Sequence, residues 1–514
     1  MNYITKSSRS QIQFLSIDQM VSDDSWARIV DLFVDCIPFD EIKFKHSDLN
    51  KEGRPPFAPS DMMKLFLYCY KYGIRSSYKI HHQCLVNIEV VWLIGNLRPS
   101  PRKIQYFRKH NSTAIKSVFS FFGQLLKDWD LLGGELIAID SFKIRAQNSL
   151  KNNFNKKKIN RHIDYIDSKI EEYLHSIEEQ DNEEEKIKIE KKISYQESKK
   201  KIYEELGKQI EESDQEQIST TDPDSRGVIL HRNIVNVGYN VQAASDAKYK
   251  LLIHAETGNV NDTHDLAPMA IKAKEILGVE TLEVLADKGY HTGAQLKECE
   301  QNKIVTYVSP KQSSSTKKNP AFAFSAFKYN AEKDTYRCPA DQEMSTNGNY
   351  YRKGNVSYQI KQYKTKSCKT CPIREQCTTS SNGRVVERSE YQEYITRNNE
   401  RVNSNPDYYR QRQQIIEHQF GTFKRQMHFD HTLMRGKEHV MTEVRMIMIC
   451  YNLRRLMSIF SLRELKSKLI AALNTLLYLR ALIRNQVNNI EIQTSDRGCE
   501  LMRKFPYFVN LSSC

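Results

Sequence analysis

Two acidic residues lie where a divalent cation could be bound at the rim of a sheet. Asp140 ends an apolar run at residues 134–140, and Asp287 ends a second apolar run at residues 281–287. Both runs have the composition of buried strands, and a carboxylate at a strand end lies where substrate can reach it. Carboxylate oxygens suit Mg²⁺ and Mn²⁺. Acids that converge on two such ions can support phosphoryl transfer.

Glu417 is the third candidate acid, and the sequence predicts that it lies on a helix. Residues 408–426 carry apolar side chains at helical spacing. Lys424 follows Glu417 by seven residues, or two turns, so both side chains are expected on one helix face. A carboxylate that binds metal could then work beside a lysine that holds the adjacent phosphate. Taken singly, each acid is more often a cap or turn residue than a ligand.

A cluster of cysteines offers a second metal site. Cys368 and Cys371 form a CxxC pair, and Cys338 and Cys377 could complete a set of four thiolates. Four cysteines around Zn²⁺ would hold together a small segment that lacks its own core. Zinc is the interpretation we favour. The last pair is not CxxC, so an iron–sulfur cluster and free thiols are the alternatives.

Charge and the lack of targeting signals restrict the class of protein. Basic residues exceed acidic ones by 14 in this chain of 514 residues, which favours a polyanionic partner such as nucleic acid. The first 50 residues contain no uninterrupted apolar run of the secretory kind. Residues 465–483 are apolar but carry three basic residues, so a packed helix is predicted there rather than a membrane span. We therefore expect a cytosolic protein with no membrane contact.

The first part of the chain, residues 1–125, is predicted to be helical. A small helical bundle is the plainer interpretation, but a basic stretch between Leu97 and His110 favours contacts to a phosphate backbone. This stretch has no acidic residue, and its basic residues are Arg98, Arg102, Lys103, Arg108 and Lys109. We expect Arg102 and Lys103 to contact DNA.

The remaining segments are predicted to form a catalytic core with two insertions. Residues 130–310 are expected to form the first part of an α/β core, and residues 396–460 the rest of it. Residues 155–220 are rich in Lys and Glu and predict an inserted helical hairpin, with Ile166, Ile202 and Leu206 among its seam residues. Residues 311–395 form the insertion that contains the cysteine cluster, and residues 461–514 a helical tail. His264, His291, Asp262 and Asp265 are interpreted as polar loop or turn residues rather than catalytic ones.

Short motifs in a fixed order resemble those of the DDE transposases of bacterial insertion sequences. In the first part, the sequences GRPPF (53–57), YGIRSS (72–77), WLIG (92–95) and LRP (97–99) are similar to an InsH-type N-terminal transposase domain. In the core, the similar motifs are AIDSFK (138–143), YNVQAA (239–244), ADKGY (286–290), IEHQFGTFKR (416–425), RG (435–436) and YNLRR (451–455). Each motif is weak alone, and their joint presence in order carries the resemblance.

The resemblance implies a fold, a reaction and a set of site residues. It implies a ribonuclease-H-like mixed sheet with flanking helices, preceded by an all-helical DNA-binding domain. It implies cleavage at the terminal inverted repeats of an element, dependent on Mg²⁺ or Mn²⁺, and attack of the freed 3′-hydroxyl on target DNA. Asp140, Asp287 and Glu417 would bind two metal ions, and Lys424 and Arg425 would contact DNA. The partners would be double-stranded DNA at element ends and target, and a second copy of the chain, in a bacterial cytosol close to the nucleoid.

One position departs from the pattern of some relatives. They place an Arg four residues before the Glu, where this chain has Gln413. Arg412 and Arg410 lie close by, and we expect one of them to contact DNA.

Two rival functions stay open at this point. The first is a nuclease of the same fold that cuts without joining. The second is a transposase-derived DNA-binding protein that has lost catalysis.

Overall fold

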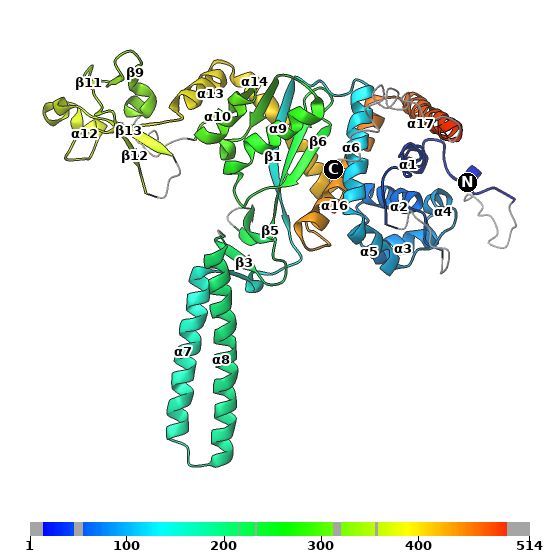
Figure 1. Ribbon diagram of the computed structural model, residues 1–514, viewed down its shortest axis with the longest axis horizontal. Coiled ribbons are helices and arrows are strands. Elements are labelled where there is room, and N and C mark those ends of the chain that lie inside the picture. The colour runs from blue at the N-terminus through cyan, green and yellow to red at the C-terminus, as the bar shows by residue number, and fades with distance from the viewer. Residues whose placement is uncertain are drawn as a thin grey trace, which may run out of the picture. The chain divides into compact units, whose positions relative to one another are not determined.

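The structure is a computed structural model that describes residues 14–45, 55–213, 215–231, 234–311, 320–354 and 358–490 (Figure 1). Gly53 and Arg54 of the first motif lie outside this range, as do residues 312–319 of the second predicted insertion and the end of the predicted tail from residue 491. The fold is mixed α/β, and the chain divides into two compact units. Unit 1 comprises Met1–Asp130, Phe142–Val241 and Gln419–Cys514, and unit 2 comprises Leu131–Ser141 and Gln242–His418.

A mixed sheet of six strands contains the strands that carry the first two acids. Its order is β4-β5-β1-β7-β8, with β6 also paired to β5. β4 and β5 are antiparallel, whereas β1, β7 and β8 run parallel. The strands are β1 (Leu136–Arg145), β4 (Arg226–His231), β5 (Ile234–Asp246), β6 (Leu252–Thr257), β7 (Leu282–Ala286) and β8 (Ile304–Val308).

Strand β1 corrects one detail of the sequence prediction. Asp140 does not end the strand, because β1 continues through Arg145. The pairing with β7, however, stops at Ile139, which lies opposite Ala286. Asp140 is therefore the first residue beyond the parallel ladder, although it is still within a strand.

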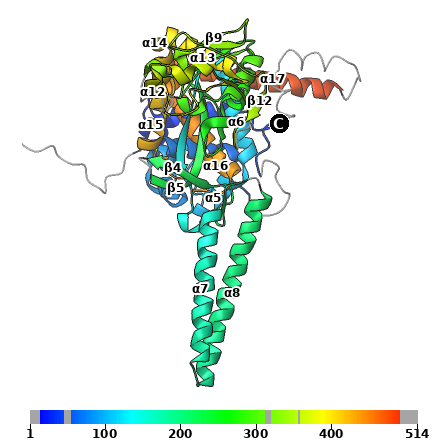
Figure 2. The ribbon, with the colours of Figure 1, turned by 90° about the vertical axis from the view of Figure 1, so that its left-hand side faces the viewer.

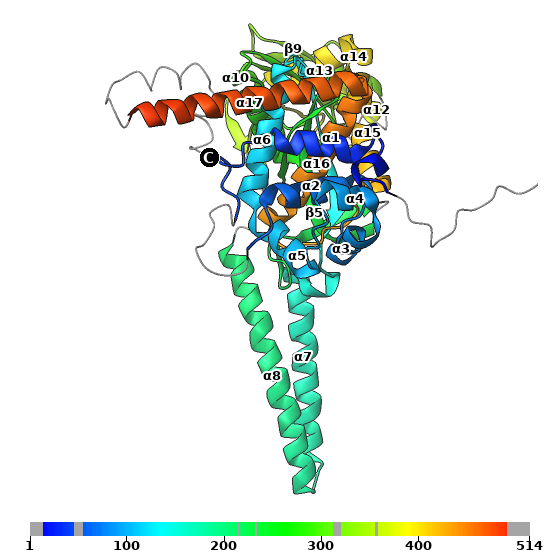
Figure 3. The same cartoon turned by 90° about the vertical axis from the view of Figure 1, so that its right-hand side faces the viewer.

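Helices of unit 1 pack around the almost fully buried helix α2 (Pro59–Lys71). Apolar residues lie on all sides of α2, which is typical of a helix covered on more than one face. Helices α1 and α16 both contact it, and α16 also packs on α6. Figure 3 shows α17 lying along α1. The bounds are α1 (Trp26–Asp35), α3 (Ser77–Val86), α4 (Ile88–Leu93), α5 (Pro101–His110), α6 (Ser112–Asp128), α15 (His418–Arg425), α16 (Lys437–Ile459) and α17 (Leu462–Ile490).

The charged segment forms the helical hairpin that its periodicity predicts. Helices α7 (Lys156–Glu178) and α8 (Glu183–Glu212) run side by side (Figures 1 and 2). Asn182 caps α8, and three glutamates occupy its first turn, where negative charge is favourable. Leu206 and Ile166 are buried, but Ile202 is exposed, so the predicted seam is interrupted there. The short strands β2 (Asn153–Asn155) and β3 (Gln217–Ser219) pair at the base.

Unit 2 contains the helices of the core and a separate small β-structure. Helix α9 ends before Gly278, whose φ of 68° is readily adopted by glycine. The other helices are α10 (Gly293–Gln301), α12 (Arg374–Cys377), α13 (Gln392–Ser404) and α14 (Pro406–Arg412), with α9 at Leu266–Leu277. Two small sheets are formed by β9 (Lys328–Asn330), β10 (Thr335–Arg337) and β11 (Glu343–Met344), and by β12 (Tyr350–Arg352), β13 (Gln359–Tyr363) and β14 (Val386–Ser389).

The late apolar stretch forms part of a helix, as predicted. Within the described residues, no helix is both long enough and apolar enough to cross a bilayer. The stretch lies in α17, where Leu465 and Leu469 are buried.

Candidate active site

Asp140 and Asp287 occupy matching positions at the end of the parallel pairing between β1 and β7. The ladder joins Leu136 to Glu283 and ends with Ile139 opposite Ala286. Asp140 and Asp287 are the next residue on each strand. Because the ladder residues other than Glu283 are apolar and most are buried, the ladder is fixed in the core, and the two carboxylates follow it at the same edge.

Arg412 joins the first acid to the third. Its guanidinium donates to Asp140 Oδ2 at 2.8 Å and to Glu417 Oε1 at 2.8 Å. The side chain of Arg412 is 10% exposed, whereas those of Asp140 and Glu417 are 19% and 46% exposed. A largely buried cation thus holds two carboxylates from distant parts of the sequence in one cluster.

The Arg412–Glu417 contact depends on an irregularity in the helix. Residues Gln413–Glu417 form a π-helical turn, η8, between α14 and α15. In a regular α-helix, side chains meet at spacings of three and four residues. A π-turn is built on bonds between residues five apart, so it aligns Arg412 with Glu417. The continuous α-helix predicted over residues 408–426 is therefore wrong at this point. Arg412 contacts Glu417 from five residues away, although some relatives place their arginine four residues before the acid, at the position of Gln413.

Burial and neighbouring charge shape the protonation of the first acid. The pKa of Asp140 is raised to about 6, mainly by burial and to a smaller extent by the negative charges of Asp287 and Glu417. Arg412 and the backbone amide of Ser141 act in the opposite direction. The electrostatic influence of both other acids on Asp140 means that the three carboxylates share one local environment.

A buried hydrogen-bond network lies next to the acids, and the sequence prediction missed it. The Gln242 side-chain amide donates to Asp262 at 2.8 Å and to Asp265 at 3.0 Å, and it accepts from the Tyr290 hydroxyl. Tyr290 is fully buried, and this burial raises the pKa of its hydroxyl well above the usual range, with smaller contributions from the charges of Asp262 and Asp140. The network secures the residues that follow Asp287. Gln242 and Tyr290 belong to the motifs YNVQAA (239–244) and ADKGY (286–290). A glutamine within a buried strand is the sequence feature that could have indicated this network.

The two histidines belong to other surroundings. His291 bonds to Asn399 at 3.0 Å, and His264 is exposed in the 3₁₀ turn η3 (Asp262–His264). These positions agree with the interpretation of both as polar loop residues.

No preassembled metal site is present in the described parts of the chain: no group of three or more His, Cys, Asp and Glu side chains is arranged to hold an ion. At the acids, this follows from the place of Arg412, whose guanidinium lies between Asp140 and Glu417. The oxygen donors are of the kind that Mg²⁺ and Mn²⁺ prefer. Their convergence on an ion would require Arg412 to move.

Comparison with known families gives two matches. Residues 15–110 match the family described as Transposase domain (DUF772), and residues 337–457 match the family described as Transposase DDE domain. Both matched families are transposase families, which is consistent with a DDE transposase of an insertion sequence. The resemblance seen in its motifs is thereby confirmed. The second match includes Glu417 and the cysteine cluster, whereas Asp140 and Asp287 lie outside both matches.

Comparison with individual proteins adds one similar structure. No curated protein matches the chain. Among solved structures, the chain is similar to a cryo-EM structure of piggyBac transposase in a synaptic complex with hairpin DNA. The identity is 11%, the alignment covers 92% of this chain and 87% of that chain, and the TM-score is 0.31.

The basic residues predicted to contact DNA differ in their exposure to solvent. Arg102 and Lys103 are exposed on α5. Arg108 is not, because it is buried and donates to the Tyr70 hydroxyl and the Arg75 carbonyl. Arg108 therefore stabilises the helical unit and is no part of a surface stretch.

The basic residues around the third acid fall into two groups. Arg410 is exposed and pairs with Asp407, whereas Arg412 is buried against the acids. Lys424 and Arg425 are exposed in α15 and belong to unit 1, whereas Glu417 belongs to unit 2. Partial desolvation and the positive charge of Lys143 lower the pKa of Lys424. A shared helix face for Glu417 and Lys424 stays a prediction.

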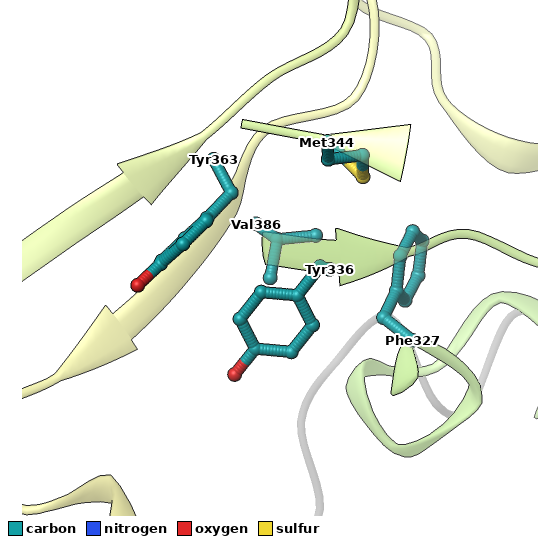
Figure 4. Close-up of a cluster of buried hydrophobic side chains, with 5 residues drawn as sticks. All are labelled: Phe327, Tyr336, Met344, Tyr363 and Val386. Carbon is teal, nitrogen blue, oxygen red and sulfur yellow. The ribbon is translucent and has the colours of Figure 1, made fainter. Parts of the chain in front are cut away.

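The four clustered cysteines line one small pocket of unit 2. Cys338, Cys368, Cys371 and Cys377 all contribute to its wall. Beside it lies a core of buried side chains, Phe327, Tyr336, Met344, Tyr363 and Val386 (Figure 4), on which Cys338 and Cys377 pack. Gly383 has a φ of 84°, and a Cβ there would lie 2.6 Å from the Cβ of Cys368. Only glycine fits so close to this thiol.

Proposed function

We propose that this protein is a DDE transposase that binds the terminal inverted repeats of an insertion sequence, cleaves DNA there and joins the freed ends to target DNA. The observation that carries the proposal is the cluster in which Asp140 and Asp287 directly follow the last pair of one parallel ladder while Arg412 links Asp140 to Glu417. Matches to two transposase families support the same reaction class. A silent DNA-binding protein would have no need to keep three acids in one environment.

The acids suit a divalent ion as ligand groups. A guanidinium held by two carboxylates marks a place where the protein already stabilises positive charge. We propose Asp140, Asp287 and Glu417 as ligands of Mg²⁺ or Mn²⁺, with Arg412 withdrawing from them. Two bound ions would activate the attacking oxygen and stabilise the leaving oxygen.

Other residues would hold DNA and the acids in place. The Gln242–Tyr290 network fixes the segment after Asp287, and so keeps that carboxylate at the ladder's edge. Lys424, Arg425 and Arg410 are exposed cations that would contact the phosphate backbone, together with Arg102 and Lys103 of the helical region. Arg412 would reach DNA only after leaving the acids.

We propose the remaining architecture on the same resemblance. The mixed sheet supports a ribonuclease-H-like core, with residues 155–220 and 311–395 as insertions. The four cysteines would hold a structural Zn²⁺ after a small shift of their side chains, and Gly383 leaves room for Cys368 to turn inward. The protein would act in the bacterial cytosol as a dimer or larger assembly, because two element ends must be brought together.

The test is cleavage of a labelled duplex that carries the native element's end, with Mg²⁺ or Mn²⁺, by wild type and Asp287→Ala. A matched control is Asp407→Asn, which changes an exposed acid of unit 2. Cleavage and joining by wild type and control, lost in Asp287→Ala, are expected. Binding without cleavage by wild type would instead identify the silent DNA-binding protein. Cleavage without joining would identify a nuclease.

A further inference from the structure

A cavity of about 390 Å³ in unit 1 has a strongly basic wall. It is bounded by residues 43–45, by the junction between α5 and α6, and by the first turn of α16. Its cationic or titratable side chains are Lys43, Lys45, Lys109, His110 and His439, and Glu438 is its one acid. Within the described residues, the salt bridges include none made by these three lysines. Among the described residues, the cavity wall therefore carries more cationic side chains than its single carboxylate can balance.

The lysines of the wall are held by buried neighbours. Phe44 is buried and stacks on Phe107 with ring centroids 5.8 Å apart, so Lys43 and Lys45 on either side of it face outward. Asn111 is buried, accepts from the Lys45 backbone amide at 2.6 Å and donates to the Phe107 carbonyl at 2.8 Å. The backbone that carries Lys45 is thus held in place before any ligand arrives, which lowers the entropic cost of binding.

The wall also offers backbone donors. Helix α6 starts at Ser112, and no side chain caps its first turn. Thr113 and Ala114 of this turn line the cavity. Uncapped amides at a helix start attract anions, and here they add to the lysines. The pKa of His110 is lowered by burial and by the charges of Lys109, Lys45 and His439, which agrees with a group of like charges gathered around one space.

We propose that this cavity binds one backbone phosphate of DNA, with Lys45, Lys109 and the first turn of α6 as its ligands. The inference deepens the proposed function. DNA is favoured over free phosphate because exposed Arg102 and Lys103 lie on α5, the helix that ends at the cavity. A line of cations that leads into a basic cavity fits a chain of phosphates better than a single ion.

The experiment measures the binding of the full chain to a duplex with the element's end, in EDTA, across a range of salt concentrations. Lys45→Ala/Lys109→Ala is compared with wild type and with Lys116→Ala/Lys127→Ala, which removes two exposed lysines of α6 outside the cavity. The cavity variant should weaken binding about tenfold or more and reduce the salt slope by about 1, since one phosphate contact contributes about 0.9. The control pair should change both values less.

A second variant and a second probe separate the alternatives. Thr113→Glu puts a carboxylate at the helix start, where it favours the helix but competes with phosphate, so it should fold and bind DNA weakly. Single methylphosphonate substitutions in the DNA should reveal one position that weakens wild type but not Lys45→Ala/Lys109→Ala. No such position, with unchanged DNA binding by both variants, would overturn the proposal.

Inorganic phosphate is tested by ³¹P line broadening. Binding of inorganic phosphate that both variants lose, with DNA binding unchanged, would mean a free-phosphate site and would also overturn it. The DNA-binding measurement is made in EDTA and does not depend on cleavage. Its result therefore tests the cavity even if the cleavage test of the proposed function fails.

Discussion

Arg412 reaches Glu417 across five residues because the π-turn at Gln413–Glu417 adds one residue to the helix. The same guanidinium holds Asp140, so a single side chain connects the third acid to the first. The sequence departure at Gln413 is thereby compensated by backbone geometry. This relationship makes Arg412 the residue whose replacement is most informative about the acids.

Replacement of Arg412 by alanine should strengthen the binding of divalent ions. The change removes a cation that competes for Asp140 and Glu417, so the negative potential at the acids increases. We expect Mn²⁺ affinity, measured by electron paramagnetic resonance, to rise several-fold. Arg410→Ala is the control, since Arg410 is exposed and pairs only with Asp407 in the described contacts. Weaker Mn²⁺ binding by Arg412→Ala would contradict a shared site for arginine and metal.

The raised pKa of Asp140 predicts a pH-dependent contribution to stability. Its pKa is about 6 in the folded chain, against about 3.9 in an unfolded one. Between about pH 4 and about pH 6 the folded chain binds more protons at Asp140 than the unfolded chain does. The contribution of Asp140 to the free energy of unfolding is therefore complete below about pH 4 and is lost as pH rises through about 6. Asp140→Asn lacks this titration. In metal-free buffer, the unfolding free energy of the variant relative to wild type should therefore increase with pH over this window and then level off. Urea unfolding at several pH values measures it, and a difference independent of pH would refute the prediction.

Loss of one partner of a buried ion pair in unit 1 should strongly lower the free energy of unfolding. Arg75 and Glu443 are 4% and 0% exposed and lie 2.7 Å apart. Arg75 also donates to the carbonyls of His428 and His431, which fixes the loop after α15. Arg75→Ala leaves a buried carboxylate unpaired and should cost about 3–5 kcal/mol. Arg75→Met/Glu443→Leu should cost less than either single change. Urea unfolding decides this, and a loss below about 1 kcal/mol in Arg75→Ala would show that the pair is unimportant.

Zinc should be found with the purified protein and should depend on Gly383. Gly383→Ala introduces a Cβ 2.6 Å from that of Cys368 at a φ unfavourable for alanine, so the thiol is displaced. We expect about one zinc per chain by elemental analysis, and its loss in both Gly383→Ala and Cys371→Ser. Ser367→Ala is the control on the same segment. Iron with visible absorption would indicate a cluster instead, and no metal at all would mean free thiols.

Several features could be predicted from the sequence because they depend on local pattern. The helical hairpin follows from apolar periodicity, and the strands that precede Asp140 and Asp287 follow from two apolar runs. The π-turn could not be predicted, because one additional residue hardly changes a helical pattern over a short segment. The burial of Arg108 could have been predicted from the sequence. Ile104 and Phe107 precede it at steps of four and one, and these spacings place all three on one face of α5.

The most direct test of one catalytic site is to change each acid separately and measure cleavage of the element's end in a single turnover. Asp140→Asn, Asp287→Asn and Glu417→Gln keep the shape of each side chain but remove its charge. We predict that all three bind the duplex as wild type does and that each loses cleavage by at least a hundredfold in Mg²⁺. Cleavage near the wild-type rate by any one variant, or by wild type in EDTA, would contradict a single metal-dependent site built from these acids.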